Sequence, residues 1–284
     1  MINKFEISRK AKEFGLQSST IEKDYVLGWM LIGIQNHPQT KDSWIFKGGT
    51  CLKKCFFNRY RFSEDLDFTL MDSQQMKEEA LRLIFKEIAH WVYEQSGIEI
   101  PENLISLDPH RSLSVQGKLS YRGPLKQPTP YPSIKLDLTA NEQIVLKPEK
   151  RVIFHEYSDC PTETPRILSY SYEEIFAEKL RALAERARPR DLYDVVHLYQ
   201  ERHRLTDIAK LLESLQGKCA FKKMSMPNLT TIEQHPQRSE FLSEWKNMLH
   251  HQVKDLQPFD YFWGHLPDVF TWIYSKQESQ KEIV

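Results

Sequence analysis

The sequence is poor in cysteine, which excludes a disulfide-rich scaffold. Its four cysteines are scattered, and no two of them form a Cys-x-x-Cys pair. Cys51 and Cys55 are four residues apart and would face one another on a helix, but we interpret them as reduced thiols. The chain is therefore expected to depend on its apolar core for stability.

An excess of charge is also absent. The sequence carries 39 basic and 39 acidic side chains, so its formal net charge is zero. This balance removes the simplest argument for nucleic-acid binding, which is a basic excess over the whole chain. Any contact with a polyanion must come from a local patch of basic residues.

Long hydrophobic runs are missing as well. The longest one, from Tyr25 to Ile34, is interrupted by Gly28 and Gly33 and is too short to span roughly 30 Å of hydrocarbon as a helix. The segment 1–6 lacks the apolar core of a signal peptide. We therefore expect a cytoplasmic protein with no membrane partner.

What is present is an ordinary globular composition, with 40% apolar and 27% charged residues over 284 positions. Helical periodicity and capping signals predict helices over residues 18–34, 50–57, 76–95, 171–187 and 191–199, with Thr50, Ser171 and Asp191 as N-caps. Alternating or short apolar runs predict strands at 44–46, 66–70, 104–107, 113–121, 134–139 and 152–154. The pattern is typical of an α+β middle between helical ends.

The stretch 46–68 contains the first chemical signal, the pair Asp65 and Asp67. Side chains alternate along a strand, so these two carboxylates project from one face about 7 Å apart. They repel each other, and a divalent cation such as Mg²⁺ or Mn²⁺ is the simplest way to sustain the pair. The pair therefore predicts a metal site.

A phosphate-binding signal precedes the pair. Lys47 is followed by Gly48, Gly49 and Thr50, which open a helix. Free backbone N–H groups and the positive end of the helix dipole favour an anion there, and the glycines allow close approach. An anion site beside paired carboxylates is what nucleoside-triphosphate chemistry needs.

A third acid fits this arrangement. In the run 134–139, the side chains of Lys135, Asp137 and Thr139 share one face of the expected strand. If this strand neighbours the one with Asp65 and Asp67, Asp137 completes a triad able to hold two metal ions. Each signal alone has a simpler interpretation, a solvated face or a plain turn, but their order and separation favour the functional one.

Two segments together resemble the first motif of the AbiEii/AbiGii-type toxin nucleotidyltransferases: 48–50 (Gly-Gly-Thr) and 61–68 (Arg-Phe-Ser-Glu-Asp-Leu-Asp-Phe). Three others are similar to the N-terminal helix and later motifs of that family: 22–25 (Glu-Lys-Asp-Tyr), 178–182 (Glu-Lys-Leu-Arg-Ala) and 190–194 (Arg-Asp-Leu-Tyr-Asp). The family, which includes the MenT-type toxins that modify tRNA, belongs to the DNA-polymerase-β-like nucleotidyltransferase superfamily.

The resemblance implies an α+β fold with a nucleotidyltransferase-type mixed sheet flanked by helices and followed by a helical C-terminal region. Residues 1–165 would form the N-terminal helices and the core. Residues 166–284 would form a helical domain that completes the active-site cleft.

It also implies roles for individual residues. Asp65, Asp67 and Asp137 would hold the metal and, with Lys179 and Asp194, carry the catalysis. The nucleotide would be bound by Lys47, Gly48, Gly49, Thr50, Ser63, Lys179 and Asp191. From the residues alone, snorkelling explains Lys179 and helix capping explains Asp191, so those alternatives stay open.

The implied activity is transfer of a nucleoside monophosphate from an NTP to an RNA acceptor such as the 3′ end of tRNA. The implied setting is a toxin–antitoxin or phage-defence system with a cognate antitoxin protein. A protein or small-molecule acceptor, or a nucleotide-binding module without turnover, are the alternatives.

Two basic clusters are candidates for the flanks of the cleft. The first contains Lys53, Lys54, Arg59 and Arg61, and the second contains Arg186, Arg188 and Arg190. Ordinary solvated charge is the competing interpretation of both clusters.

Overall fold

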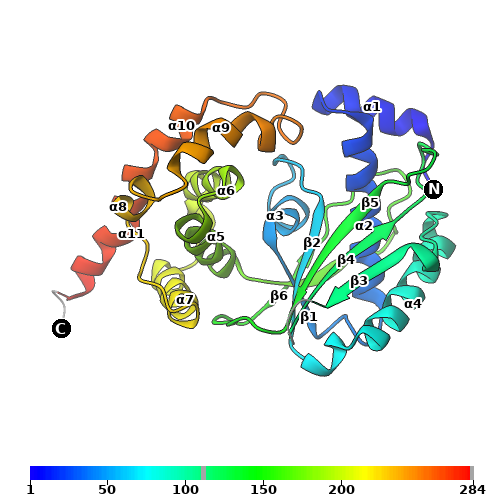
Figure 1. The fold of residues 1–284 in the computed structure, drawn as a ribbon, viewed down its shortest axis with the longest axis horizontal. Helices are drawn as coiled ribbons and strands as arrows, with labels where there is room; N and C mark the ends of the chain where they lie inside the picture. Colours follow the sequence, from blue (N-terminus) through cyan, green and yellow to red (C-terminus); the bar gives the residue numbers. More distant parts are fainter. Residues whose placement is uncertain (110–112, 282–284) are drawn as a thin grey trace. The chain divides into compact units, whose positions relative to one another are not determined.

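The computed structural model of the chain describes residues 1–109 and 113–281, which divide into two compact units (Figure 1). Unit 1 consists of Met1–Glu142, Pro148–Ser169 and Gln252–Lys254. Unit 2 consists of Gln143–Lys147, Tyr170–His251 and Asp255–Val284. Neither unit is one continuous stretch of chain.

Unit 1 is built on a mixed sheet, which has seven strands within the described residues. Their order is β3 (Ile105–Pro109), β4 (Ser114–Ser120), β5 (Ser133–Thr139), β2 (Asp65–Leu70), β1 (Trp44–Lys47), β7 (Arg166–Ser169) and β6 (Glu149–Val152). The pairs β2–β5 and β1–β7 are parallel and the others are antiparallel. The mixed sheet is the fold class that the sequence predicts.

One face of this sheet is apolar and covered by helices. Trp44, Phe46 and Phe68 point to it and are fully buried, and the ring of Trp44 packs against Phe85. Phe85 lies on α4 (Glu78–Ser96), which runs beside α2 (Ser18–Asn36) (Figure 1). α1 (Lys4–Phe14) packs on α2 in turn. The opposite face carries the polar residues of β2 and β5.

Two strand predictions need correction. The strand expected at 152–154 is β6, and it lies earlier, at Glu149–Val152. β7 stands where the chain was expected to turn directly from Pro165 towards a helix. Its four residues are too few to show a clear alternation, and its pairing with β1 and β6 depends on distant parts of the chain.

Unit 2 is helical, as the sequence predicts. Its helices are α5 (Tyr172–Arg186), α6 (Pro189–Gln200), α7 (Ile208–Phe221), α8 (Leu229–Glu233), α9 (Arg238–Leu249), α10 (Phe259–Gly264) and α11 (Leu266–Lys281). The hydroxyl of Ser171 caps α5 by accepting the Glu174 backbone N–H at 3.1 Å, as expected.

The segment Gln143–Lys147 is fastened inside unit 2 by Glu174. This carboxylate is fully buried, accepts the backbone N–H groups of Val145 and Leu146, and forms an ion pair of 2.7 Å with Lys218. The ammonium group of Lys218 also donates to the carbonyl of Gln143. A buried carboxylate with this many partners holds the segment firmly.

Candidate active site

The three predicted carboxylates lie on neighbouring strands of the sheet. β5 pairs in parallel with β2, and the register sets Asp137 opposite Asp67 and Lys135 opposite Asp65. Paired residues of adjacent strands share a face, so Asp65, Asp67 and Asp137 all project from the polar face. Asp65 and Asp67 are half-buried, whereas Asp137 is exposed. The neighbouring strands that the third-acid prediction required are present.

The Gly48 turn lies directly against this group. Gly48 has φ of +80°, in the left-handed region that favours glycine, and a Cβ at this position would overlap Oδ2 of Asp67. Lys47 is paired with Asp67 across the antiparallel strands β1 and β2. The chain can therefore turn from β1 into α3 (Gly48–Cys51) beside Asp67 only with glycine at position 48.

Thr50 and Ser63 lie next to the start of β2. The buried Thr50 hydroxyl donates to the backbone carbonyl of Asp65, and a Cβ on Gly49 would lie 3.1 Å from Oγ of Ser63. Thr50 is not the helix cap expected from the sequence, because the helix already begins at Gly48 and Lys47 occupies the N-cap position. The Thr50 hydroxyl thereby ties the helix to the strand that bears Asp65.

Lys47 has a partner that the sequence did not indicate. Its ammonium group forms an ion pair with Glu142, and Oε2 of Glu142 also accepts the hydroxyl of Thr69 at 2.7 Å. Thr69 follows Asp67 on the same face of β2. Glu142 lies in an irregular segment after β5, so no periodicity could have marked it as part of the site.

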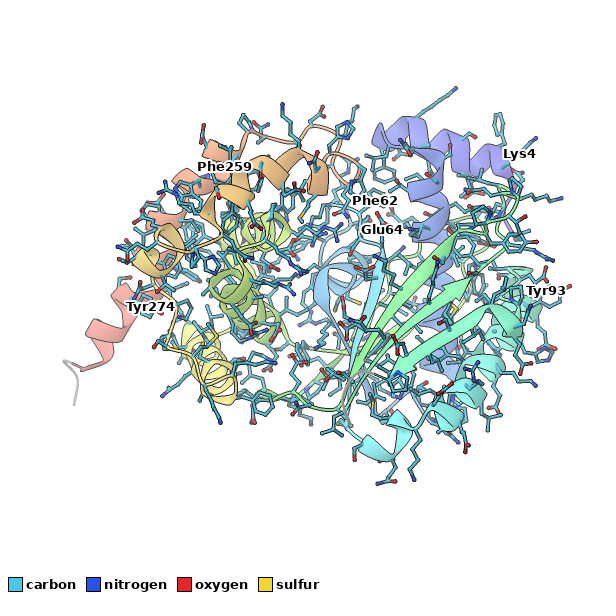
Figure 2. The ribbon with its side chains drawn as sticks, viewed as in Figure 1. Lys4, Phe62, Glu64, Tyr93, Phe259 and Tyr274 are labelled. Atoms are coloured by element: carbon cyan, nitrogen blue, oxygen red, sulfur yellow. The ribbon has the colours of Figure 1, made fainter. Side chains whose placement is uncertain are left out.

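The Glu-Lys-Asp-Tyr segment of α2 is joined to the same region by side-chain contacts. Lys23 forms a 2.7 Å ion pair with Glu64. Glu64 is the residue just before β2 (Figure 2). Asp24 accepts from Lys54 at 2.7 Å and from the hydroxyl of Tyr157 at 2.9 Å. Burial raises the pKa of Asp24, but the ammonium groups of Lys54 and Lys53 outweigh it and keep that pKa below its usual value. The segment therefore acts as a scaffold for the loops around the site.

Three of the four residues of the first basic cluster are buried, which corrects the sequence-based expectation, and Arg59 is exposed. Lys53, Lys54 and Arg61 are each no more than 5% exposed. The ammonium group of Lys53 donates to the carbonyl of Asn58, and Arg61 donates to the side chain of Gln252 at 2.9 Å. Lys53 and Lys54 lie within a wide helical turn, Leu52–Phe56, and Arg61 follows this turn in the sequence.

The later motif residues form a buried ion-pair cluster within unit 2. Lys179 lies 2.6 Å from Asp194 and 3.5 Å from Asp191, and Arg186 binds Asp191 through two nitrogens at 2.7 and 2.8 Å. Both carboxylates are at most 1% exposed. Burial raises the pKa of Asp191, but the charges and hydrogen bonds of Lys179 and Arg186 prevail and hold it below its usual range.

Asp191 is not the N-cap of its helix. α6 begins at Pro189, with Arg188 in the cap position. Proline suits the first helical position because it has no N–H to satisfy there. Asp191 therefore lies inside the first turn, where its carboxylate is used by Lys179 and Arg186. Arg188 is exposed and Arg190 is partly exposed.

The donor set of the sheet suits a hard divalent cation by its chemistry, since carboxylate oxygens are the preferred ligands of Mg²⁺. Within residues 1–109 and 113–281, however, no group of three or more acidic, histidine or cysteine side chains is arranged as ligands of one ion. The backbone register thus places Asp67 and Asp137 opposite each other. Their side chains are not arranged around a common point as metal ligands are.

A comparison with protein families identifies the chain. Residues 33–272 match the family described as "Nucleotidyl transferase AbiEii toxin, Type IV TA system". The chain belongs to this family. It is a nucleotidyltransferase toxin of a toxin–antitoxin family, with a nucleotide as its substrate. The match covers the strand pair, the Gly48 turn and the Lys179 cluster.

Solved structures share this fold. MenT4, a nucleotidyltransferase toxin from Mycobacterium tuberculosis H37Rv, aligns with a TM-score of 0.68 at 17% identity, over 96% of this chain and 90% of its own. JHP933 from Helicobacter pylori aligns with a TM-score of 0.54 at 17% identity, over 94% and 97%. A search of curated proteins found no match. Among the described residues, no helix has the length and apolarity needed to cross a bilayer.

Proposed function

We propose that this toxin transfers a nucleoside monophosphate from an NTP to a hydroxyl of RNA, with the 3′ end of tRNA as the expected acceptor. The observation that carries the proposal is the parallel register of β2 and β5, which sets Asp137 opposite Asp67 beside the Gly48 turn. Three carboxylates then share one face next to backbone that is free of side chains. This combination suits a triphosphate and its counter-ion.

Asp65, Asp67 and Asp137 are the residues that would hold Mg²⁺ or Mn²⁺. When bound, the ion neutralises negative charge on the triphosphate and polarises its α-phosphoryl group. Backbone N–H groups at Gly48 and Gly49 would contact the phosphates, as would the predicted ligands Lys47 and Ser63. The buried Thr50 hydroxyl donates to Asp65 and so supports the site through the backbone.

In the proposed reaction, the 3′ oxygen of the acceptor forms a bond to the α-phosphorus. The bond between the α-phosphorus and its bridging oxygen breaks, and pyrophosphate leaves. Asp137, the exposed member of the group, accepts the proton of the attacking hydroxyl. The catalytic roles of Lys179 and Asp194 and the nucleotide-binding roles of Lys179 and Asp191 stay predictions, because these side chains are ion-paired with one another inside unit 2.

The test is incorporation of label from each α-³²P-NTP, with Mg²⁺ or Mn²⁺, in a mixture of RNA, protein and small-molecule acceptors. We expect the label on RNA. Asp65→Ala and Asp67→Ala should lower incorporation at least roughly 100-fold with the fold intact, because the charge-compensating site is lost. Asp42→Asn is the matched control, since its carboxylate is exposed and pairs only with exposed Lys150 among the described contacts.

Full incorporation by the double variant Asp65→Ala/Asp67→Ala would contradict the assignment of the carboxylates. Label on protein or on a small molecule would support the proposed nucleotidyl transfer but contradict RNA as the acceptor. Nucleotide binding without product under every metal condition would indicate a binding module.

A further inference from the structure

Two lysines on the polar face of the sheet stand directly opposite each other. Lys118 on β4 is the antiparallel partner of Lys135 on β5, and both side chains are exposed. Like charges opposite one another destabilise a sheet, by up to about 1 kcal/mol. In the part of the chain that the structure describes, neither lysine has an ion pair or a hydrogen bond through its side chain. An anionic ligand would turn this repulsion into attraction.

The pair has a defined place relative to the candidate active site. Across the sheet, the order is the Gly48 turn after β1, then β2 with Asp65 and Asp67, then β5 and β4 (Figure 1). Lys135 is in register with Asp65 on one side and with Lys118 on the other. Both lysines therefore lie beyond Asp65 and Asp67, on the side away from the Gly48 turn, and Lys135 shares β5 with Asp137.

This order matches the geometry of phosphoryl transfer. The attacking and leaving oxygens lie roughly in line on opposite sides of the α-phosphorus. If the leaving pyrophosphate is held at the Gly48 turn, the acceptor approaches from the side of β5 and β4. The cations that it meets there are Lys135 and Lys118. The next pair on the same face of this ladder is Ser120 and Ser133, whose hydroxyls suit sugar and phosphate oxygens.

We propose that Lys118 and Lys135 bind backbone phosphates of the acceptor RNA close to its reacting 3′ end. The inference rests on the proposed function, because it needs the triphosphate at the Gly48 turn. A polyanionic strand explains why two cations face each other on an open sheet surface, whereas the hydroxyl of a protein acceptor would need no such pair. It also explains how a chain of zero net charge engages RNA.

The test compares the double variant Lys118→Ala/Lys135→Ala with Lys77→Ala/Lys86→Ala. Both variants lose two exposed lysines, but Lys77 and Lys86 are on or next to α4, which packs against the apolar face. We expect the KM for RNA to rise roughly tenfold in the first variant, because phosphate contacts are lost. For this variant, a plot of the logarithm of RNA affinity against the logarithm of salt concentration should have a slope that is shallower by about 1.4. The KM for NTP should stay within about twofold, as should both constants in the control.

A second measurement is independent of turnover. Fluorescence anisotropy with a labelled hairpin RNA, without NTP, should show the same loss of affinity in the Lys118/Lys135 variant alone. Unchanged RNA affinity would overturn the proposal, and so would a wild-type protein that does not bind RNA. A raised KM for NTP with an unchanged KM for RNA would assign the lysines to the triphosphate instead. If wild type binds RNA without labelling it, the proposed function fails while anisotropy still decides on the lysines.

Discussion

At the residue scale, the candidate site depends on the absence of a side chain at Gly48. The residue combines a positive φ with an approach of Asp67 that leaves no room for a Cβ. Its two constraints have different consequences, because the first concerns backbone strain and the second concerns the position of a carboxylate. Replacement should therefore affect the chemistry more than the fold.

We predict that Gly48→Ala lowers nucleotide incorporation roughly 100-fold, because Asp67 must move by a distance that catalysis does not tolerate. The free energy of unfolding should fall by only about 1 to 2 kcal/mol, from strain in the left-handed region. Gly264→Ala is the control, since nothing lies within 4 Å of a Cβ there. Labelling assays and urea denaturation measure the two effects. Equal activity of both variants would refute the packing argument.

At the element scale, the helices α5 and α6 are joined by charge as well as by apolar packing. Lys179 and Arg186 come from α5, and Asp191 and Asp194 come from α6. The carboxylate of Asp191 has two cationic partners, so removing its charge takes one counter-ion from each of them, although Lys179 keeps Asp194. Breaking a buried pair by removing one partner typically costs several kcal/mol.

Asp191→Asn should lower the free energy of unfolding at pH 7 by about 3 kcal/mol. The pKa of Asp191 is lowered in the folded protein, so its contribution is full above the unfolded value near 3.9. This contribution to stability is lost as the pH falls further, through the pKa that Asp191 has in the folded protein. The gap between wild type and variant should therefore narrow below about pH 4, as followed by circular dichroism in urea. Asp260→Asn, at an exposed site on α10, should show no gap at either pH.

Local sequence patterns predicted some of these helices and strands well. They predicted less well which strands pair and which side chains contact each other. The alternation around Asp137 predicted β5, and the Asp65–Asp67 pair was recognised on its strand. The parallel pairing of β2 with β5 was only a condition in the sequence, because pairing depends on residues far apart in the chain. Glu142 was missed for the same reason, since its partners Lys47 and Thr69 come from distant strands.

The burial of the first basic cluster was a different kind of error. Lysines and arginines in a polar run suggest a solvated surface, but Lys54 is only 2% exposed and is paired with Asp24 on α2. The pairing needs both partners to be brought together by the tertiary fold. Only the resemblance to a family drew attention to the segment 22–25. That resemblance did not explain which contacts the segment makes.

At the scale of the whole molecule, unit 1 includes a short segment from late in the sequence, Gln252–Lys254. Gln252 is 1% exposed, accepts from the guanidinium of Arg61 at 2.9 Å, and receives the backbone N–H of Phe62 at its carbonyl. The loop that leads into β2 is thus held by a residue almost two hundred positions away (|i−j| = 191).

We predict that Gln252→Leu lowers the free energy of unfolding by about 2 to 3 kcal/mol, because the buried guanidinium of Arg61 loses an acceptor. Hydrogen exchange should accelerate in the peptide that contains Arg61 and Phe62. Gln257→Leu, whose side chain is exposed, should leave that peptide unchanged. If both variants exchange alike, Gln252 has no special role in holding the loop.

The late position of Gln252 also has a consequence for synthesis on the ribosome. All strands of the sheet have been made once residue 169 has emerged, yet the loop before Asp65 still lacks its partner. That partner, Gln252, emerges only after the helices α5 to α9 have been translated. We therefore expect a nascent chain that stalls or terminates before residue 252 to contain the whole sheet while the loop before Asp65 is not yet fixed. A cell would then meet the active toxin only after Gln252 has been translated.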